Sequence, residues 1–142
     1  MCHYLLGITS VLYPIRLPLL ANLIVLIAPT FFAHYKSITR GYSTQILLQG
    51  DTLKYFQNNN ETLSLIISKE VKNSLNKLLK NAHPETLGLI KAPSNKFQYD
   101  GAMYTTLEVI WNGKNYKSDG FDDDNPPKKL SPFISFLISL VK

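Results

Sequence analysis

The chain has few of the side chains that carry most enzyme and metal chemistry. A single cysteine, Cys2, excludes an intrachain disulfide, and three widely separated histidines exclude most dense metal sites. The glycines that follow residue 41 are isolated turn residues, so no phosphate-binding glycine loop is present. Nucleophilic catalysis needs a base positioned beside the nucleophile. We do not expect His83 to be that base, because its place before Pro84 suits an interaction with the last carbonyls of a helix. We therefore expect no catalytic residue, no cofactor and no metal, and a protein that is not an enzyme.

Acidic residues are absent from the first 41 positions. This segment holds three basic residues (Arg16, Lys36 and Arg40) and no Asp or Glu, whereas the remaining 12 Lys and Arg nearly balance 10 Asp and Glu. The lysines after residue 41 are spread out and offset by acids, so they form no contiguous basic stripe. We therefore expect no binding to nucleic acid.

The longest run without a charged residue covers positions 17–35, LPLLANLIVLIAPTFFAHY. A helix of this length spans the ~30 Å hydrocarbon core of a bilayer. Pro29 would kink it, and the uninterrupted apolar part, Leu19 to Ala28, also suits a secretory signal. We therefore expect residues 1–40 to form a hydrophobic helix that is a membrane anchor or a signal, with membrane contact through residues 17–35. The protein would be single-pass or secreted, on an undetermined side of the membrane, and the alternative is a buried helix of a soluble protein.

Residues 41–142 are predicted to form a separate small α+β domain. Strands are expected at 42–49, 53–56, 62–67 and 104–111. A helix is expected from the N-cap Ser68 to Ala82, with its apolar residues on one stripe. Asn112 and Gly113 predict a type I′ turn into 114–118, and a terminal helix, apolar on nearly every side, is expected to begin at the N-cap Ser131. This order predicts a small antiparallel sheet of about four strands, with two helices packed on one face.

Two loops of this domain are candidates for contacts. The connection His83 to Asn95 is expected to carry Leu87, Leu89 and Ile90 toward the core. The acidic loop, residues 119–125, concentrates four carboxylates, those of Asp119, Asp122, Asp123 and Asp124. Hard cations such as calcium bind several such oxygens at short range, although the spacing is not that of an EF-hand. The acidic loop is therefore interpreted either as a weak cation site or contact loop, or as a solvated turn.

Three segments resemble a known family. They are ISKEVKNSLNKLL, FQYDGAMYTTLEV and NPPKKLSPFISFL, and in the last of these Pro127, Leu130, Pro132, Phe133 and Leu137 fit a proline-led terminal helix. Over residues 42–140 this layout resembles the emfourin-like family of small protein inhibitors of thermolysin-like zinc metallopeptidases. The resemblance implies a strand pair, a helix and a second strand pair that precedes a terminal helix. It carries over no inhibitory residue.

Two hypotheses about function follow. The first is a non-catalytic, membrane-anchored or exported domain that binds another protein, with metallopeptidase inhibition as its most specific form. The alternative is a small-ligand or cation-binding module that uses the acidic loop together with the long connection before it.

Overall fold

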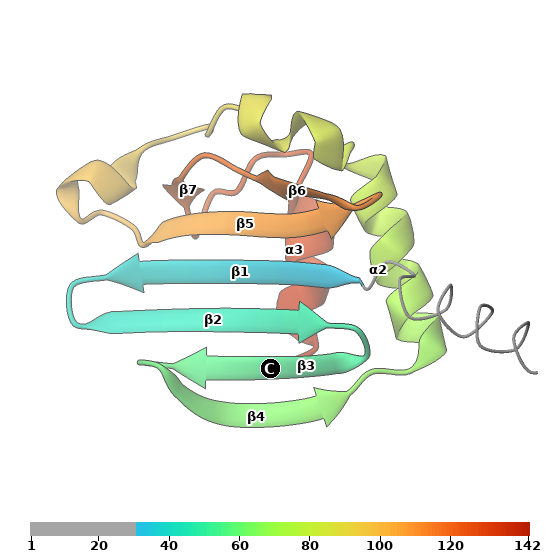
Figure 1. The fold of residues 1–142 in the computed structure, drawn as a ribbon. Helices are drawn as coiled ribbons and strands as arrows, with labels where there is room; N and C mark the ends of the chain where they lie inside the picture. The colour runs from blue at the N-terminus through green and yellow to red at the C-terminus, as the bar shows by residue number, and fades with distance from the viewer. Residues whose placement is uncertain (1–30) are drawn as a thin grey trace, which may run out of the picture.

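Residues 31–142, which a computed structural model describes, contain seven strands in one antiparallel sheet (Figure 1). The strands are β1 (Phe32–Thr39), β2 (Tyr42–Gln49), β3 (Thr52–Gln57), β4 (Asn60–Ile66), β5 (Tyr104–Trp111), β6 (Lys114–Lys117) and β7 (Phe121–Asp122). They lie in the order β4-β3-β2-β1-β5-β6, and β7 pairs with β5. The expected α+β class is confirmed, but the sheet is larger than the expected four strands.

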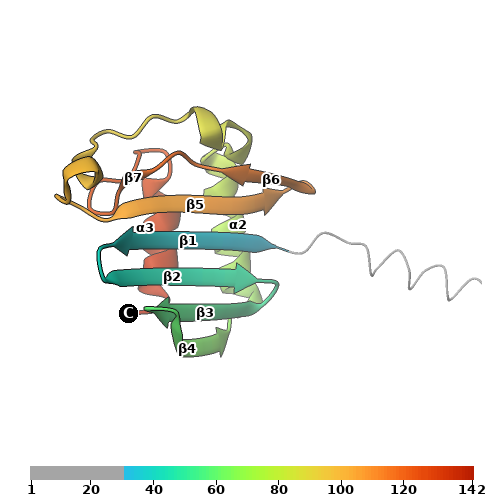
Figure 2. The same cartoon turned by 60° about the vertical axis from the view of Figure 1, so that its left-hand side comes forward.

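β1 lies inside the sheet, between β2 and β5 (Figures 1 and 2). Ala33 and Tyr35 point into the core and are only 0% and 5% exposed. The expected domain boundary between residues 40 and 41 is therefore wrong, because it falls in the turn that joins β1 to β2. The long-range pairing with β5 ties this strand to residues far along the chain, and local sequence does not reveal that pairing.

The expected membrane contact through residues 17–35 is wrong at its carboxyl end. Phe32–Tyr35 are residues of β1, and two of them, Ala33 and Tyr35, are buried on the helix side of the sheet. Residues 17–30 of that run, and most of the expected leader helix, lie outside the described residues. Within residues 31–142, neither helix combines the length and apolar composition that crossing a bilayer requires.

The two expected helices are present, and both lie on one face of the sheet (Figures 1 and 2). They are α2 (Lys69–Asn81) and α3 (Ser131–Ser139). Ser68 caps α2 as expected, since its hydroxyl accepts a hydrogen bond from the amide of Val71 at 3.2 Å. α3 is preceded by Leu130 at its N-cap position and has no side-chain cap, so Ser131 is the first helical residue rather than the cap.

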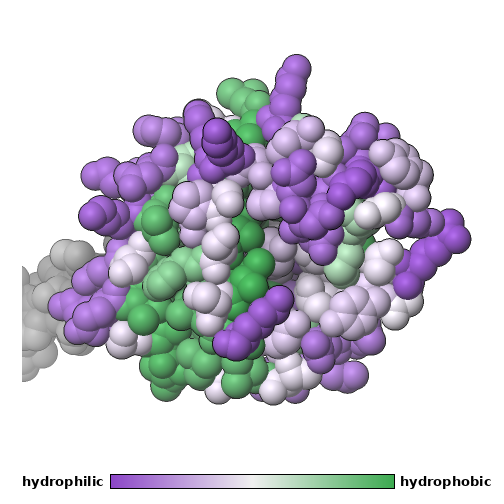
Figure 3. Space-filling model, turned by 180° about the vertical axis from the view of Figure 1, so that it is seen from behind, coloured by the Kyte–Doolittle hydropathy of each residue, from purple (hydrophilic) through white to green (hydrophobic). Residues whose placement is uncertain are grey.

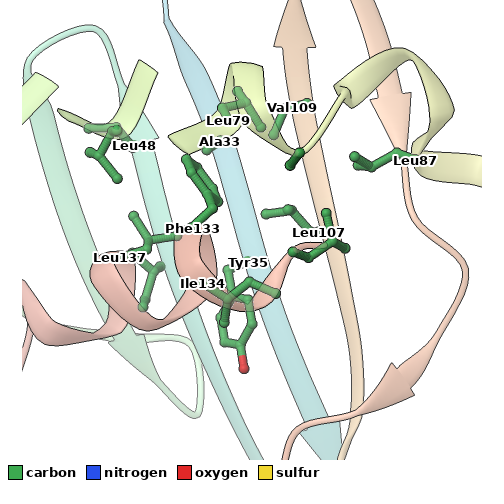
Figure 4. Close-up of a cluster of buried hydrophobic side chains, with 14 of the residues drawn as sticks. Ala33, Tyr35, Leu48, Leu79, Leu87, Leu107, Val109, Phe133, Ile134 and Leu137 are labelled. Carbon is green, nitrogen blue, oxygen red and sulfur yellow. The ribbon is translucent and has the colours of Figure 1, made fainter. Parts of the chain in front are cut away.

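Cross-strand rows of side chains build the buried face of the sheet. The first row is Leu65, Leu53, Leu48, Ala33 and Val109, and the second is Leu63, Tyr55, Ile46, Tyr35 and Leu107. Helix residues such as Leu79, Phe133 and Leu137 pack against them (Figure 4). A third row, Gln57, Thr44, Ser37 and Thr105, is polar. The apolar rows therefore hold the helices, and the hydrophobic core ends where the polar row begins.

The helix layer keeps part of its apolar surface at the outside. Hydrophobic side chains gather over it when the molecule is seen from the helix side (Figure 3). α3 buries Phe133, Ile134 and Leu137, whereas Phe136 and Ile138 are only partly buried. α3 is thus apolar on more than one side, as expected, and it buries one of these sides fully and another only partly.

Candidate functional site

The long connection between α2 and β5 carries two short 3-10 helices that lie along the β5 and β6 side of the sheet (Figure 1). They are η1 (Pro84–Leu89) and η2 (Lys96–Tyr99). Leu87 is fully buried and fixes η1 to the core, as expected, whereas Leu89 is 81% exposed. The expectation that Leu89 turns toward the core is therefore wrong. Leu89 follows Leu87 by two positions in a short 3-10 helix, so the two side chains lie on different sides of η1 and only Leu87 faces the core.

The acidic loop is attached to this connection by Asp122. β7 pairs with β5 so that Asp122 is opposite Tyr104, and its side chain is fully buried. One carboxylate oxygen, Oδ2, accepts hydrogen bonds from the Ser94 hydroxyl at 2.5 Å and the Lys96 amide at 3.0 Å. The other, Oδ1, accepts from the Phe97 amide at 2.8 Å. We call this set of three bonds the Asp122 anchor; it satisfies a buried charge with the donors it requires.

The Asp122 anchor also sets the charge state of the carboxyl group. Loss of water around Asp122 raises its pKa, whereas the bonds from Ser94, Lys96 and Phe97 and the positive charge of Lys96 lower it. The hydrogen bonds prevail, and the pKa of Asp122 lies below its ordinary value. Asp122 is therefore ionised at neutral pH and acts as a fixed acceptor at the base of the loop.

The other three acidic side chains do not act together. Asp123 Oδ1 accepts from the Met103 amide at 2.9 Å, and Asp124 pairs with Lys96 Nζ at 2.7 Å. Asp119 is exposed. In the described part of the chain, no three His, Cys, Asp or Glu side chains are grouped so that they could hold a metal ion. Asp122 is not available to the predicted contact loop, because it is buried and the anchor uses both of its oxygens. A contact role for Asp119, Asp123 and Asp124 stays a prediction.

A groove opens between the two loops that the Asp122 anchor joins. Its volume is about 570 Å³, and we call it the loop groove. Leu89, Ile90, Lys91 and Pro93 line it together with Thr86, Pro127, Lys128 and Lys129. Its walls thus combine apolar side chains with three lysines, and none of these lining residues is acidic. Asp122 is held inward, and the surface beside the acidic loop is basic and apolar.

The Asp122 anchor is adjacent to both walls of the loop groove. Ser94 directly follows Pro93 of one wall, and its hydroxyl also accepts a hydrogen bond from Asn125 Nδ2 at 2.9 Å. Asn125 in turn is separated from Pro127 of the other wall by one residue, Pro126. Backbone bonds to a buried carboxylate are well suited to fixing loop geometry. The groove therefore has walls that are positioned before any partner arrives.

The two described histidines are engaged away from the loop groove. His34 Nε2 lies 2.8 Å from Gln45 Oε1, and His83 Nδ1 lies 3.9 Å from Glu85 Oε1. The backbone amide of His83, rather than its ring, bonds to the Lys80 carbonyl at 3.1 Å. The expected contact of the His83 ring with the last helix carbonyls is thus wrong, and the ring lies near Glu85 instead.

Sequence reasoning singled out both loops but missed the groove between them. Lys91 belongs to one loop, whereas Lys128 and Lys129 belong to the other, and only the fold brings them to one surface. The sequence feature that could have indicated this basic surface is the pair of consecutive lysines after Pro126 and Pro127. Comparison of the chain with protein-family models, with characterised proteins and with solved structures finds no match.

Proposed function

We propose that this chain is a non-catalytic domain that binds another protein, and that the loop groove is its contact surface. The observation that carries the proposal is Leu89, a large apolar side chain that is 81% exposed in a groove with preformed walls. Covering such a side chain stabilises a complex by roughly 1.5 to 3 kcal/mol, before the costs of association.

The lysines define the kind of partner. Lys91, Lys128 and Lys129 surround the apolar residues of the loop groove without a neighbouring acid in its lining. A partner segment that places an apolar side chain between carboxylates complements both features. Charge complementarity of this kind accelerates association and is screened by salt, so binding should weaken as ionic strength rises.

Inhibition of a thermolysin-like metallopeptidase is the most specific form of this proposal, and it rests on the resemblance over residues 42–140. Of the residues that carry the resemblance, Leu130, Phe133 and Leu137 are buried in the core, and Pro127 lines the loop groove. The terminal segment therefore serves the fold through its leucines and phenylalanine. Its contact with a peptidase would be made by Lys128 and Lys129, which are exposed next to the buried Pro127.

The length of the uncharged sequence before β1 indicates whether the protein is exported or attached to a membrane, and so where it would meet its partner. With Phe32–Tyr35 in β1, the uncharged sequence that precedes this strand is residues 17–31, which is shorter than the roughly 20 residues of a spanning helix. This length favours a secretory signal over an anchor. We therefore propose export, with membrane attachment as the alternative. Sequencing the amino terminus of the mature protein distinguishes the two.

The test measures hydrolysis of a peptide substrate by thermolysin in the presence of the full chain. We expect saturable inhibition by the intact protein, without its degradation, and weaker inhibition at high salt. Leu89→Asp should raise the inhibition constant by about tenfold or more, because it removes apolar contact and places a carboxylate where we expect acidic partner groups.

Ile66→Asp is the matched control for Leu89→Asp. Ile66 is 78% exposed, nearly as much as Leu89, but it ends β4 on the sheet face that the helices do not cover. Inhibition by Ile66→Asp should equal that of the unaltered chain. Equal loss in both variants would show that the loop groove is not the contact surface, and no inhibition at a large molar excess of intact protein would remove the inhibitor proposal.

A further inference from the structure

A second hollow lies on the buried face of the sheet, next to the carboxyl end of α3. Its volume is about 380 Å³, and we call it the hydroxyl cavity. It is lined by Tyr35, Ser37, Tyr42, Thr44, Ile46, Tyr55, Gln57, Met103, Asp123, Ile138, Val141 and Lys142. Five of these side chains carry hydroxyl groups, which is an unusual concentration beside a hydrophobic core. The cavity shares no residue with the loop groove.

The sequence of the strands explains why this space is open. The third cross-strand row places Thr44, Ser37 and Thr105 side by side, where the two rows before it have mostly leucine, isoleucine and tyrosine. These side chains are small, and α3 ends at Ser139, so neither the sheet nor the helix fills the volume. The Tyr35 ring closes the hydrophobic cluster at this point, and its hydroxyl points away from the other labelled side chains (Figure 4).

One wall of the hydroxyl cavity offers oriented donors. Gln57 Nε2 donates hydrogen bonds to the phenol oxygens of Tyr42 and Tyr55, at 3.3 Å each. Both phenol oxygens act as acceptors in these bonds, so their own O–H groups are left to donate elsewhere. Deeper in, the Ser37 and Thr105 hydroxyls lie 2.7 Å apart and bond to each other. Burial raises the pKa of Tyr35, so its phenol stays protonated at neutral pH.

Another wall offers an acceptor and apolar contact. Asp123 uses Oδ1 for the Met103 amide, and a carboxylate has a second oxygen that accepts hydrogen bonds. Ile46, Ile138 and Val141 supply apolar surface to the same cavity. Ligand sites in proteins commonly combine a concave apolar lining with a few polar groups that fix orientation.

We propose that the hydroxyl cavity binds a neutral polyhydroxylated molecule of about the size of a monosaccharide. Each hydroxyl of such a molecule both donates and accepts, which suits phenol donors on one side and a carboxylate acceptor on the other. Its C–H faces suit the tyrosine rings and the aliphatic side chains. Asp123 and Lys142 both line the cavity and carry opposite charges, so the lining favours neither an anion nor a cation, and the described residues form no group of metal ligands.

The test is a titration of the isotope-labelled full chain with glucose, galactose and mannose, each to millimolar concentration, followed by amide NMR shifts. We expect at least one sugar to shift the amides of Ser37, Thr44 and Met103 saturably. Tyr55→Phe and Asp123→Asn should each weaken this binding by about fivefold or more, since the first removes a hydroxyl group, the second turns an acceptor oxygen into a donor, and both keep the side-chain shape. Thr44→Leu, which fills the cavity, should abolish it.

Matched controls separate the hydroxyl cavity from the rest of the surface. Tyr99→Phe alters a phenol that is 69% exposed on η2, and Gln45→Leu alters the neighbour of Thr44 on the opposite face of the sheet. Both should bind like the unaltered chain. The proposal is overturned if no sugar shifts the cavity amides, or if Tyr55→Phe and Thr44→Leu bind as well as the unaltered chain. Saturable binding of tetramethylammonium without binding of any sugar would overturn the assigned ligand class.

Discussion

Ser94 and Asp122 are 28 residues apart in the chain, and the Ser94 hydroxyl donates a hydrogen bond to Asp122 Oδ2 at 2.5 Å. This hydrogen bond and those from the amides of Lys96 and Phe97 join the connection after α2 to the loop before α3. These are the two segments that form the walls of the loop groove. A single buried carboxylate thus determines the shape of the surface that we propose as the contact site.

Replacing Asp122 should therefore destabilise the domain. Asp122→Asn keeps the size of the side chain but removes the charge and replaces one carboxylate oxygen with an amide donor, which then faces either the Phe97 donor or the Ser94 and Lys96 donors. We expect the melting temperature to fall by roughly 5 °C or more, because unsatisfied buried donors are costly. Asp119→Asn, at an exposed position of the same loop, should leave it unchanged. Equal melting temperatures for Asp122→Asn and the unaltered chain would contradict this role.

The stability that Asp122 contributes should depend on pH. Its pKa in the folded protein lies below the value of about 3.9 for an unperturbed Asp. A lowered pKa means that the contribution is fully present above that value and is lost as pH falls through the folded-state pKa. The difference in unfolding free energy between the unaltered chain and Asp122→Asn should therefore be constant from about pH 5 to 7 and shrink below about pH 4. Urea denaturation at each pH measures it, and a difference that persists to low pH would contradict the assignment.

Leu87 and Leu89 offer a direct comparison within η1. Leu87 is fully buried, whereas Leu89 is 81% exposed. Leu87→Ala should lower the free energy of unfolding by about 2 to 4 kcal/mol, because it removes apolar contact and leaves a cavity. Leu89→Ala should change it by no more than about 0.5 kcal/mol. Denaturant titrations measure both, and a large loss with Leu89→Ala would show that Leu89 serves the fold.

The turn between β5 and β6 depends on Gly113. Its φ is +77°, in the left-handed region, and Asn112 before it has φ +51°. Gly113→Ala should cost about 1 to 2 kcal/mol, because a Cβ is strained there. Gly88→Ala is the control, since its φ is not left-handed and an added Cβ would meet only the Lys117 carbonyl at 3.6 Å. Thermal unfolding compares them, and equal stability of both variants would contradict a type I′ turn.

Local sequence signals predicted those elements whose stabilising contacts are themselves local. Ser68 and the apolar stripe after it predicted α2, and the Ser68 hydroxyl bonds to the Val71 amide only three residues on. Asn112 and Gly113 predicted the β5–β6 hairpin in the same way, since the turn needs only those two residues. The strand at 42–49 matches β2 at both ends.

The sequence did not reveal β1, because its burial comes from distant partners. Ala33 is opposite Leu48 on one side and Val109 on the other, 76 positions further along the chain. Without that pairing, FFAHY reads as the end of an apolar run. Asp122 was missed for a similar reason, since a cluster of aspartates is normally solvated and its donors lie in residues 94–97.

The position of β1 predicts which fragments fold. A fragment of residues 31–142 contains every strand and helix described here, and we expect it to unfold cooperatively. A fragment of residues 41–142 lacks the strand between β2 and β5, and with it Ala33 and Tyr35 of the core. We expect it to show no cooperative transition by circular dichroism. Cooperative unfolding of the shorter fragment at the same temperature would restore the boundary at residue 41.

The claim that the loop groove contacts a partner is tested most directly by site-specific photo-crosslinking to thermolysin. A photo-reactive amino acid is placed at position 89 in one full-length variant and at position 66 in another, both positions being highly exposed. We expect a covalent adduct with the peptidase from position 89 and none from position 66. An adduct from position 66 alone, or from neither position, would contradict it.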